Sequence, residues 1–146
     1  MSASAVAKKL GGKRVLRRDV TNELELAEAV RAGLPSSALD HLLEELAAWG
    51  ASQVEVYRVV GRARTLQRKR ANGTALSADE SDRLARLARL LVRAEEALGD
   101  EEKAHRWLAR RNRALGGQRP MTLLDSDAGA LAVERVLGRL EHGVYS

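Results

Sequence analysis

The sequence predicts an all-α protein, and three observations support that prediction. Ala, Leu, Arg and Glu dominate the 146 residues, and these residue types favour helices. Strand-forming aromatic residues are scarce, with no Phe, two Trp and two Tyr. Apolar residues recur at spacings of three and four along much of the chain, which is the period of one buried helical face. A chain of this length is long enough to bury a real core.

Composition and hydropathy exclude several classes of protein. The chain has no Cys, which excludes disulfides, thiolate zinc sites and cysteine nucleophiles and fits a reducing cytosol. No apolar run approaches the roughly 18 residues of a membrane span. The N-terminal segment lacks the apolar core of a secretory signal, although its basic, acid-poor composition leaves an organelle transit peptide as an alternative. We expect a cytoplasmic protein that contacts no membrane.

Residues 1–20 form a basic segment that we expect to be a mobile tail. Six of these residues are Lys or Arg, only Asp19 is acidic, and Gly11 and Gly12 lie in the middle. Two interpretations remain open. The segment is either a solvated leader without a specific role or a basic arm that adds sequence-independent phosphate contacts.

Three helices are predicted between this segment and Gly61. The first runs from residue 23 to Gly33, and the second follows Pro35, whose missing N–H costs little in the first turn of a helix. The second helix carries a clean apolar stripe made of Leu39, Leu42, Leu43 and Leu46. The third helix spans residues 53–60 and stops at Gly61.

The densest charge cluster in the chain overlaps and follows the third helix. Between Arg58 and Arg70 there are six basic residues and no acid. A short helix, a glycine turn and a strongly basic second helix are what a helix-turn-helix requires, because its second helix enters a groove lined with phosphates. We therefore expect these residues to contact DNA: Arg58, Arg62, Arg64, Thr65, Gln67, Arg68, Lys69 and Arg70.

Two features of this segment depart from the usual helix-turn-helix pattern. The position four residues after Gln53 is normally small where the helices cross, and here it is Tyr57. Leu66, the first apolar residue of the second helix, arrives about one residue early. We therefore predict a helix-turn-helix variant. A solvated basic helix without a DNA-binding role is the alternative.

The second half of the chain begins with its clearest local signal, a capping box formed by Ser77 and Glu80. It starts a long helix with one apolar face and one arginine face, and we interpret the arginines as solvated. Asp100 caps the next helix, whose apolar face includes Trp107. The following loop contains Gly116–Gly117, but no Lys-Ser or Lys-Thr follows and no strand precedes, so it is not a phosphate-binding loop.

The last helix is predicted from its cap and its apolar stripe. Ser126 or Asp127 caps the first turn, and Gly143 can stop the helix. One face carries Val133, Val136, Leu137 and Leu140. Residues 144–146 follow, so we expect the last helix to hold a tyrosine ring and a carboxylate at the surface in a nearly fixed position.

Charge placement indicates that the two halves meet different partners. Residues 1–75 hold 13 Lys and Arg against 8 Asp and Glu, whereas residues 76–146 hold 12 of each kind. The basic half suits a polyanion and the neutral half suits a protein. The three histidines (His41, His105 and His142) lie on different predicted helices, and no nucleophile has a base beside it. We therefore expect no enzymatic activity, no metal site and no cofactor.

Motifs in the same order along the chain resemble those of the Xre/MbcA/ParS family of antitoxins. They are Gly-Arg-Ala-Arg-Thr-Leu-Gln-Arg-Lys-Arg at 61–70, Leu-Ser-Ala-Asp-Glu-Ser-Asp-Arg-Leu at 76–84, Ala-His-Arg-Trp-Leu at 104–108, Ala-Leu-Gly-Gly at 114–117, and the glycines and stripe of the last helix. The resemblance implies an Xre-like helix-turn-helix domain at 21–74, after the basic tail 1–20. It implies a small helical domain for toxin binding and dimerisation at 75–146.

The resemblance implies a type II antitoxin whose second half holds a RES-domain toxin that degrades NAD, or a related ADP-ribosylating toxin. It also implies that the first half binds operator DNA and represses the antitoxin's own operon. Because such repressors bind paired half-sites, we expect a homodimer, joined through the long helix of the second half. The alternative is a free-standing helix-turn-helix transcriptional regulator whose second half is only a dimerisation or effector module. A neighbouring gene for a RES-like protein separates the two.

The end of the chain suggests how such a toxin is inhibited. An NAD-degrading enzyme binds an anionic pyrophosphate, so its cleft should be electropositive and offer a shelf for a ring. We expect the tyrosine ring and the final carboxylate to enter that cleft and exclude the substrate; a tail that is merely ordered at the interface is the alternative. The expected toxin-binding residues are Trp107, Arg139, Glu141, His142, Gly143, Val144, Tyr145 and Ser146.

Overall fold

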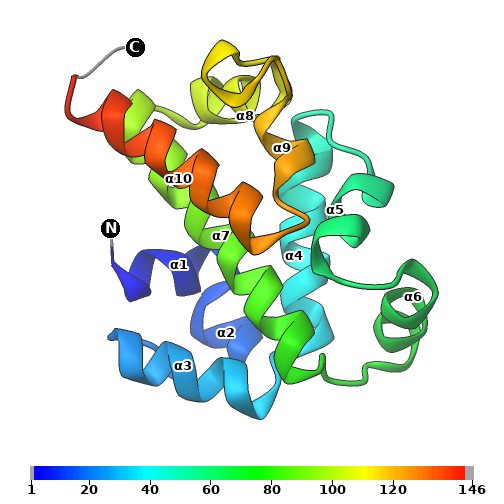
Figure 1. Ribbon diagram of the computed structural model, residues 1–146. Coiled ribbons are helices and arrows are strands. Elements are labelled where there is room, and N and C mark those ends of the chain that lie inside the picture. The colour runs from blue at the N-terminus through cyan, green and yellow to red at the C-terminus, as the bar shows by residue number, and fades with distance from the viewer. Residues whose placement is uncertain (1, 144–146) are drawn as a thin grey trace. The chain divides into compact units, whose positions relative to one another are not determined.

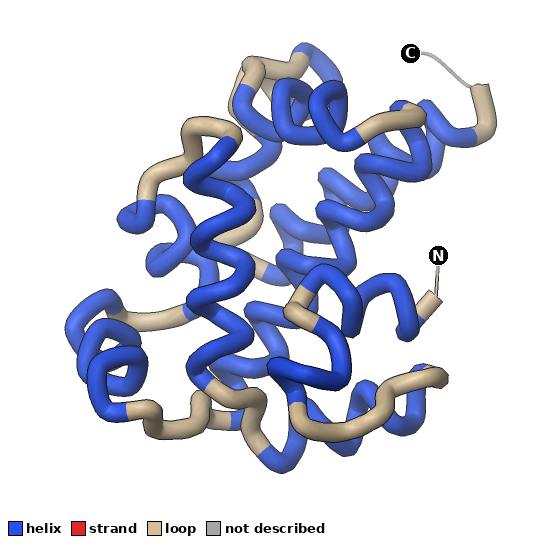
Figure 2. Tube along the Cα trace, turned by 180° about the vertical axis from the view of Figure 1, so that it is seen from behind, coloured by secondary structure: helices blue, strands red, loops and turns tan. Residues whose placement is uncertain are grey.

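The computed structural model describes residues 2–143, and Met1 and residues 144–146 lie outside the described part (Figures 1 and 2). Within the described residues every regular element is a helix, apart from one isolated β-bridge between Asn112 and Gln118. The all-α prediction is therefore confirmed. No described helix combines the length and the hydropathy that a membrane span requires.

The chain folds into two compact units that divide between Arg89 and Leu90, inside the long helix α7 (Ala78–Leu98). Among the described residues, the first unit contains the beginning of α7 and six complete helices: α1 (Ala3–Lys9), α2 (Gly12–Leu16), α3 (Glu23–Ala32), α4 (Ser36–Ala48), α5 (Gln53–Val60) and α6 (Ala63–Asn72). The division lies later in the chain than the boundary expected between residues 74 and 75. The reason is that the first turns of α7 bond to the first unit, as Ser81 does.

Helix α4 is central to the first unit and contacts α2, α5 and α6 (Figure 1). Its predicted apolar stripe is buried throughout: Leu39, Leu42, Leu43 and Leu46. Each such side chain stabilises the fold by about 1.5–3 kcal/mol through removal from water. The stripe therefore gives the helices around α4 a common surface to pack on.

The basic N-terminal segment is folded, which corrects the expectation of a mobile tail. Ser2 caps α1, because its Oγ accepts a hydrogen bond from the backbone N–H of Ala5 at 3.1 Å. Gly11 makes a fixed turn, with φ +108° and no room for a Cβ, which would lie 2.4 Å from Val15 Cγ2. Four apolar side chains placed among the basic residues are buried: Val6, Leu10, Leu16 and Val20. Their burial holds the segment in place, and four of its six basic residues are exposed: Lys8, Lys13, Arg14 and Arg17.

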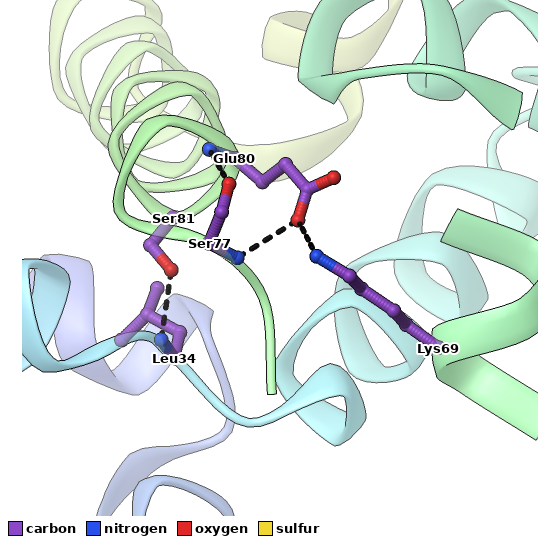
Figure 3. Close-up of polar contacts among 5 residues, drawn as sticks. All are labelled: Leu34, Lys69, Ser77, Glu80 and Ser81. Atoms are coloured by element: carbon purple, nitrogen blue, oxygen red, sulfur yellow. Dashed lines mark hydrogen bonds and ion pairs between the residues drawn. The ribbon is translucent and has the colours of Figure 1, made fainter. Parts of the chain in front are cut away.

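Backbone hydrogen bonds fasten the start of α7 to the turn between α3 and α4. Leu76 donates its N–H to the Leu34 carbonyl oxygen at 2.9 Å. Leu34 donates its own N–H to Ser81 Oγ at 2.8 Å (Figure 3). Ser81 is fully buried, so its hydroxyl needs this partner. Gly33 is required at the turn, because its φ is +93° and a Cβ would lie 2.5 Å from the Leu76 carbonyl oxygen.

The apolar face of α7, through which a dimer is expected, is covered within one chain. The apolar residues of its predicted face are buried within a single chain: Leu84, Leu87, Ala88, Leu91 and Ala94. A stable interface between copies needs an exposed apolar centre, and this face has none to offer. The expectation of a dimer joined through this helix stays a prediction.

Among the described residues, the second unit contains the end of α7, α8 (Glu101–Ala109), the 3-10 helix η1 (Arg113–Leu115), α9 (Pro120–Leu123) and α10 (Asp127–Glu141). Helix α9 contacts α8 and α10, and η1 also contacts α10. Ser126 caps α10, since its Oγ accepts the N–H of Gly129 at 3.0 Å. The predicted terminal helix is confirmed, with Val133, Val136 and Leu137 buried and Leu140 half-buried.

The first turn of α10 passes so close to the end of α9 that only glycine fits. A Cβ on Gly129 would lie 1.9 Å from the carbonyl oxygen of Leu123, so the backbone must move to accept it. We expect Gly129→Ala to lower the free energy of unfolding by about 1–3 kcal/mol, the usual cost of overpacking. Urea unfolding measures this change.

Gly138→Ala is the matched control, because it makes the same substitution in the same helix. A Cβ at Gly138 would meet only Arg93 Nη2, at 3.5 Å, which is ordinary contact. Since Ala favours a helix over Gly by about 0.8–1 kcal/mol, this variant should be as stable as the parent or more so. Equal losses in both variants would contradict the close approach of α9 and α10.

Candidate functional site

Helices α4, α5 and α6 form a helix-turn-helix region in the first unit. Ser52 caps α5, because its Oγ accepts the N–H of Glu55 at 3.2 Å, and the helix ends at Gly61. Gly61 and Arg62 make a two-residue turn into α6. Both α4 and α5 contact α6. A basic helix held in this way against two others is what is needed to present one helix to a DNA groove.

Helix α6 divides its polar residues between an inward and an outward side. Leu66 is fully buried, and Lys69 and Arg70 follow it by three and four residues, so all three lie on one side of the helix. Lys69 and Arg70 are accordingly only partly exposed. Arg64 and Arg68 lie two residues to either side of Leu66, on the opposite side of the helix, and are exposed.

Arg70 is bonded inside the first unit. Its Nε donates to Oδ1 of Asp40 on α4, and its Nη1 donates to the hydroxyl oxygen of Tyr57 on α5. Burial lowers the pKa of Arg70, but these two hydrogen bonds outweigh it and raise the pKa above its ordinary value. Tyr57 is 3% exposed, so the bulky residue that departs from the usual pattern is a core residue whose hydroxyl has found a partner.

Lys69 is held by Glu80 at the start of α7 (Figure 3). Lys69 Nζ lies 2.6 Å from Glu80 Oε1, and the same oxygen accepts the backbone N–H of Ser77 at 2.8 Å. The N–H of Glu80 donates to Ser77 Oγ at 3.1 Å, which completes the predicted capping box. Burial raises the pKa of Glu80, but the bonds from Lys69 and Ser77 outweigh it and lower the pKa below its ordinary value. Glu80 therefore stays ionised and joins α6 to α7.

The outward residues of α5, the turn and α6 form what we call the outer basic face: Arg58, Arg62, Arg64, Gln67 and Arg68. All five are exposed, and none of the four arginines has an ion-pair partner among the residues that the structure describes. Thr65 is half-buried between the two sides of α6. This face is the candidate DNA interface.

Two of the eight expected DNA contacts, Lys69 and Arg70, thus have partners inside the first unit, and their contact with DNA stays a prediction. Sequence reasoning missed Asp40 and Tyr57, which hold Arg70. Asp40 lies 30 residues before Arg70, so no local pattern links the two. The only signal in the sequence was Tyr57, a large residue with a hydroxyl group at a position where a helix-turn-helix usually has a small residue.

The expected partner-binding residues lie in the second unit. Trp107 on α8 is half-buried. Four residues at the end of α10 are exposed: Arg139, Glu141, His142 and Gly143. The helix stops as predicted, since Gly143 adopts φ +72° after the cap at His142. The other three expected residues, Val144, Tyr145 and Ser146, lie outside the described residues.

The two units define the class of protein, a helix-turn-helix domain followed by a separate helical domain. Family models match both units. The antitoxin Xre-like helix-turn-helix domain matches residues 25–89, and the antitoxin Xre/MbcA/ParS C-terminal toxin-binding domain matches residues 93–143. The first match ends at the residue where the first compact unit ends.

Whole proteins are also similar to this chain. It is 33% identical over 129 residues to a protein named Antitoxin Xre from Photorhabdus laumondii, covering 78% of this chain and 87% of the relative. A protein of the same name from Yersinia enterocolitica is 33% identical over 125 residues, covering 83% and 81%. A protein named Prs ADP-ribosylating antitoxin from a Sphingobium species is 31% identical over 91 residues, covering 56% and 57%. The chain belongs to the Xre/MbcA/ParS family of antitoxins.

The structure predicts that the Glu80 carboxylate stabilises the first unit. In Glu80→Gln the side-chain carbonyl can still accept the Ser77 N–H, but the ion pair with Lys69 is lost. We expect a loss of about 1.5–3 kcal/mol, the usual contribution of a hydrogen bond between charged groups. Urea unfolding measures the loss. Glu44→Gln, an exposed site on α4, is the control and should change stability by less than about 0.5 kcal/mol.

The same comparison has a predicted pH dependence. Because the folded-state pKa of Glu80 lies below its ordinary value of 4.5, the unfolded chain takes up the proton first as the pH falls. The stabilisation is complete above that ordinary value and is lost as the pH falls through the folded-state pKa. The stability difference between the parent and Glu80→Gln should therefore shrink on acidification. A difference that stays constant would contradict this assignment.

Proposed function

We propose that this antitoxin neutralises an NAD-degrading RES-domain toxin by direct binding and represses its own operon by binding promoter DNA. The observation that carries the proposal is the agreement between the division of the fold and the two family matches, one helix-turn-helix and one toxin-binding. The outer basic face lies in the first unit, and the expected toxin-binding residues lie in the second. This separation supports one activity for each unit.

In this proposal the outer basic face binds the promoter. Arg64, Gln67 and Arg68 share the exposed side of α6, and these are residue types that read guanine and adenine in the major groove. Arg58 and Arg62 lie at the end of α5 and in the turn, where contact with phosphates fits better than contact with bases. A homodimer that places two such faces on paired half-sites completes the proposal.

Operator binding should fall steeply with salt, because phosphate neutralisation releases counterions. We expect Arg64→Gln/Arg68→Gln to weaken binding to a fragment of the chain's own promoter. The plot of log affinity against log salt should become shallower by about 0.9 for each phosphate that the variant no longer neutralises. Fluorescence anisotropy over a range of salt concentrations measures both quantities.

Lys103→Gln/Arg135→Gln is the charge-matched control for the operator experiment. Both residues are exposed and both lie in the second unit, so this variant should bind the promoter as the parent does. A nearly flat salt response of the parent protein, or equal losses in the two variants, would argue against the outer basic face as the DNA interface.

The toxin class is proposed from the family and from chemistry. The relative named Prs ADP-ribosylating antitoxin makes an ADP-ribosylating toxin the second candidate for the partner. Both kinds of toxin bind NAD, whose pyrophosphate needs cationic groups in the cleft. The exposed carboxylate of Glu141 at the end of α10 can compete for those groups.

The segment proposed to block the cleft is Gly143 to Ser146. Helix α10 is capped at Ser126 and packed along one side, so it holds the exposed Glu141 and Gly143 at a fixed point in the second unit. The contribution of Tyr145 rests on the chemistry of its ring, since residues 144–146 lie outside the described part of the chain.

Deletion of residues 143–146 tests this mechanism. We expect the shortened chain to co-purify with the RES-domain product of the adjacent reading frame but to leave the NAD level and growth unprotected on co-expression. The full chain is the control and should protect both. Full protection by the shortened chain at the same stoichiometry would contradict the blocking segment. If the full chain neither binds nor protects, a free-standing regulator becomes the better description.

A further inference from the structure

The loop between α8 and α9 carries a second concentration of arginines. The ten residues from Arg110 to Arg119 include four Arg and no acid, whereas the rest of residues 76–146 holds 8 Lys and Arg against 12 Asp and Glu. Arg110, Arg111 and Arg113 are exposed, and among the described residues they have no ion-pair partner. We call residues 110–119 the arginine loop.

Backbone hydrogen bonds give the arginine loop one defined shape. Asn112 donates its N–H to the Gln118 carbonyl oxygen at 3.0 Å and accepts the N–H of Gly117 at 2.9 Å. Gly116 and Gly117 adopt φ +67° and +79°, which glycine tolerates best. Leu115 is 8% exposed and anchors η1, which contacts α10. A loop fixed in this way loses little conformational entropy when it binds a partner.

We propose that the arginine loop binds a cluster of carboxylates on the toxin, outside the toxin's substrate cleft. This inference rests on the proposed function. The loop lies inside the match to the toxin-binding domain, residues 93–143, which favours a protein partner over DNA. The exposed cations are all Arg, which binds carboxylates through paired hydrogen bonds and is enriched at protein interfaces.

Electrostatics place this contact away from the cleft. A cleft that binds the NAD pyrophosphate is electropositive and repels a group of arginines. The same cleft attracts the carboxylate of Glu141, which is exposed at the end of α10. The second unit therefore offers the toxin two separate surfaces, and each matches a different part of the toxin. The arginine loop provides binding and orientation, and the terminal segment provides inhibition.

The two surfaces predict separable effects on binding and inhibition. Charged groups at an interface mainly accelerate association, and salt weakens this effect. We expect Arg110→Gln/Arg111→Gln/Arg113→Gln to slow association with the toxin on the order of tenfold at low salt, and less at high salt. Saturating amounts of this variant should still inhibit NAD loss completely. The thermal midpoint should not change, because the three side chains are exposed.

The experiment uses the full chain and the purified RES-domain product of the adjacent reading frame. Biolayer interferometry at several salt concentrations gives the association rates, and anisotropy with the promoter fragment gives operator affinity. Lys8→Gln/Arg14→Gln/Arg31→Gln is the charge-matched control, since these exposed residues lie in the first unit. Its toxin association rate should equal that of the parent.

Three outcomes would overturn the inference. An unchanged association rate in the arginine-loop variant would remove the loop from the toxin interface while leaving the proposed function intact. Loss of operator affinity without loss of toxin association would make the loop a DNA contact. Failure of the parent chain to bind the toxin at all would overturn the proposed function and, with it, this inference.

Discussion

The placement of the basic helix α6 depends on the bonds that the Glu80 carboxylate makes. One of its oxygens accepts a hydrogen bond from the N–H of Ser77, which caps the start of α7. The same oxygen accepts a hydrogen bond from the ammonium of Lys69 on α6. Gly61 lies against the same side chain, since a Cβ there would be 3.3 Å from Glu80 Cγ. The turn at Gly61, the basic helix α6 and the start of α7 therefore meet at the buried carboxylate of Glu80. Such a buried charge stabilises the fold only while its partners are present.

Sequence reasoning succeeded where the signal was local. The capping box and the stripe of α4 each depend on residues within one helix, and both are present in the structure. The partners of Lys69 and Arg70 lie on other helices, and the pattern within α6 cannot name them. The period of the helix could have shown that these two residues share a side with Leu66. It could not have shown that Asp40 and Tyr57 lie opposite that side.

The N-terminal segment is the opposite case. Its basic composition led to the wrong prediction, although the segment contains a pattern of buried apolar residues. Its buried apolar residues do not form one continuous stripe, because the turn at Gly11 separates Val6 and Leu10 from Leu16 and Val20. A search for a single helical face therefore misses them and finds only the charges. Helix α10 was predictable because its cap and its stripe belong to one uninterrupted helix. The roles of the outer basic face and of residues 144–146 remain predictions.

Under the proposed function, relatives of this antitoxin that bind a different operator can change α6 freely on one side only. Arg64, Gln67 and Arg68 face away from the protein, so evolution can replace them without cost to the fold. Replacement of Arg70 leaves Asp40 and the Tyr57 hydroxyl without their donor, and a compensating change on α4 or α5 has to accompany it. Positions that vary together across the family should therefore be those that maintain the fold. Positions that vary alone should be those that contact the operator.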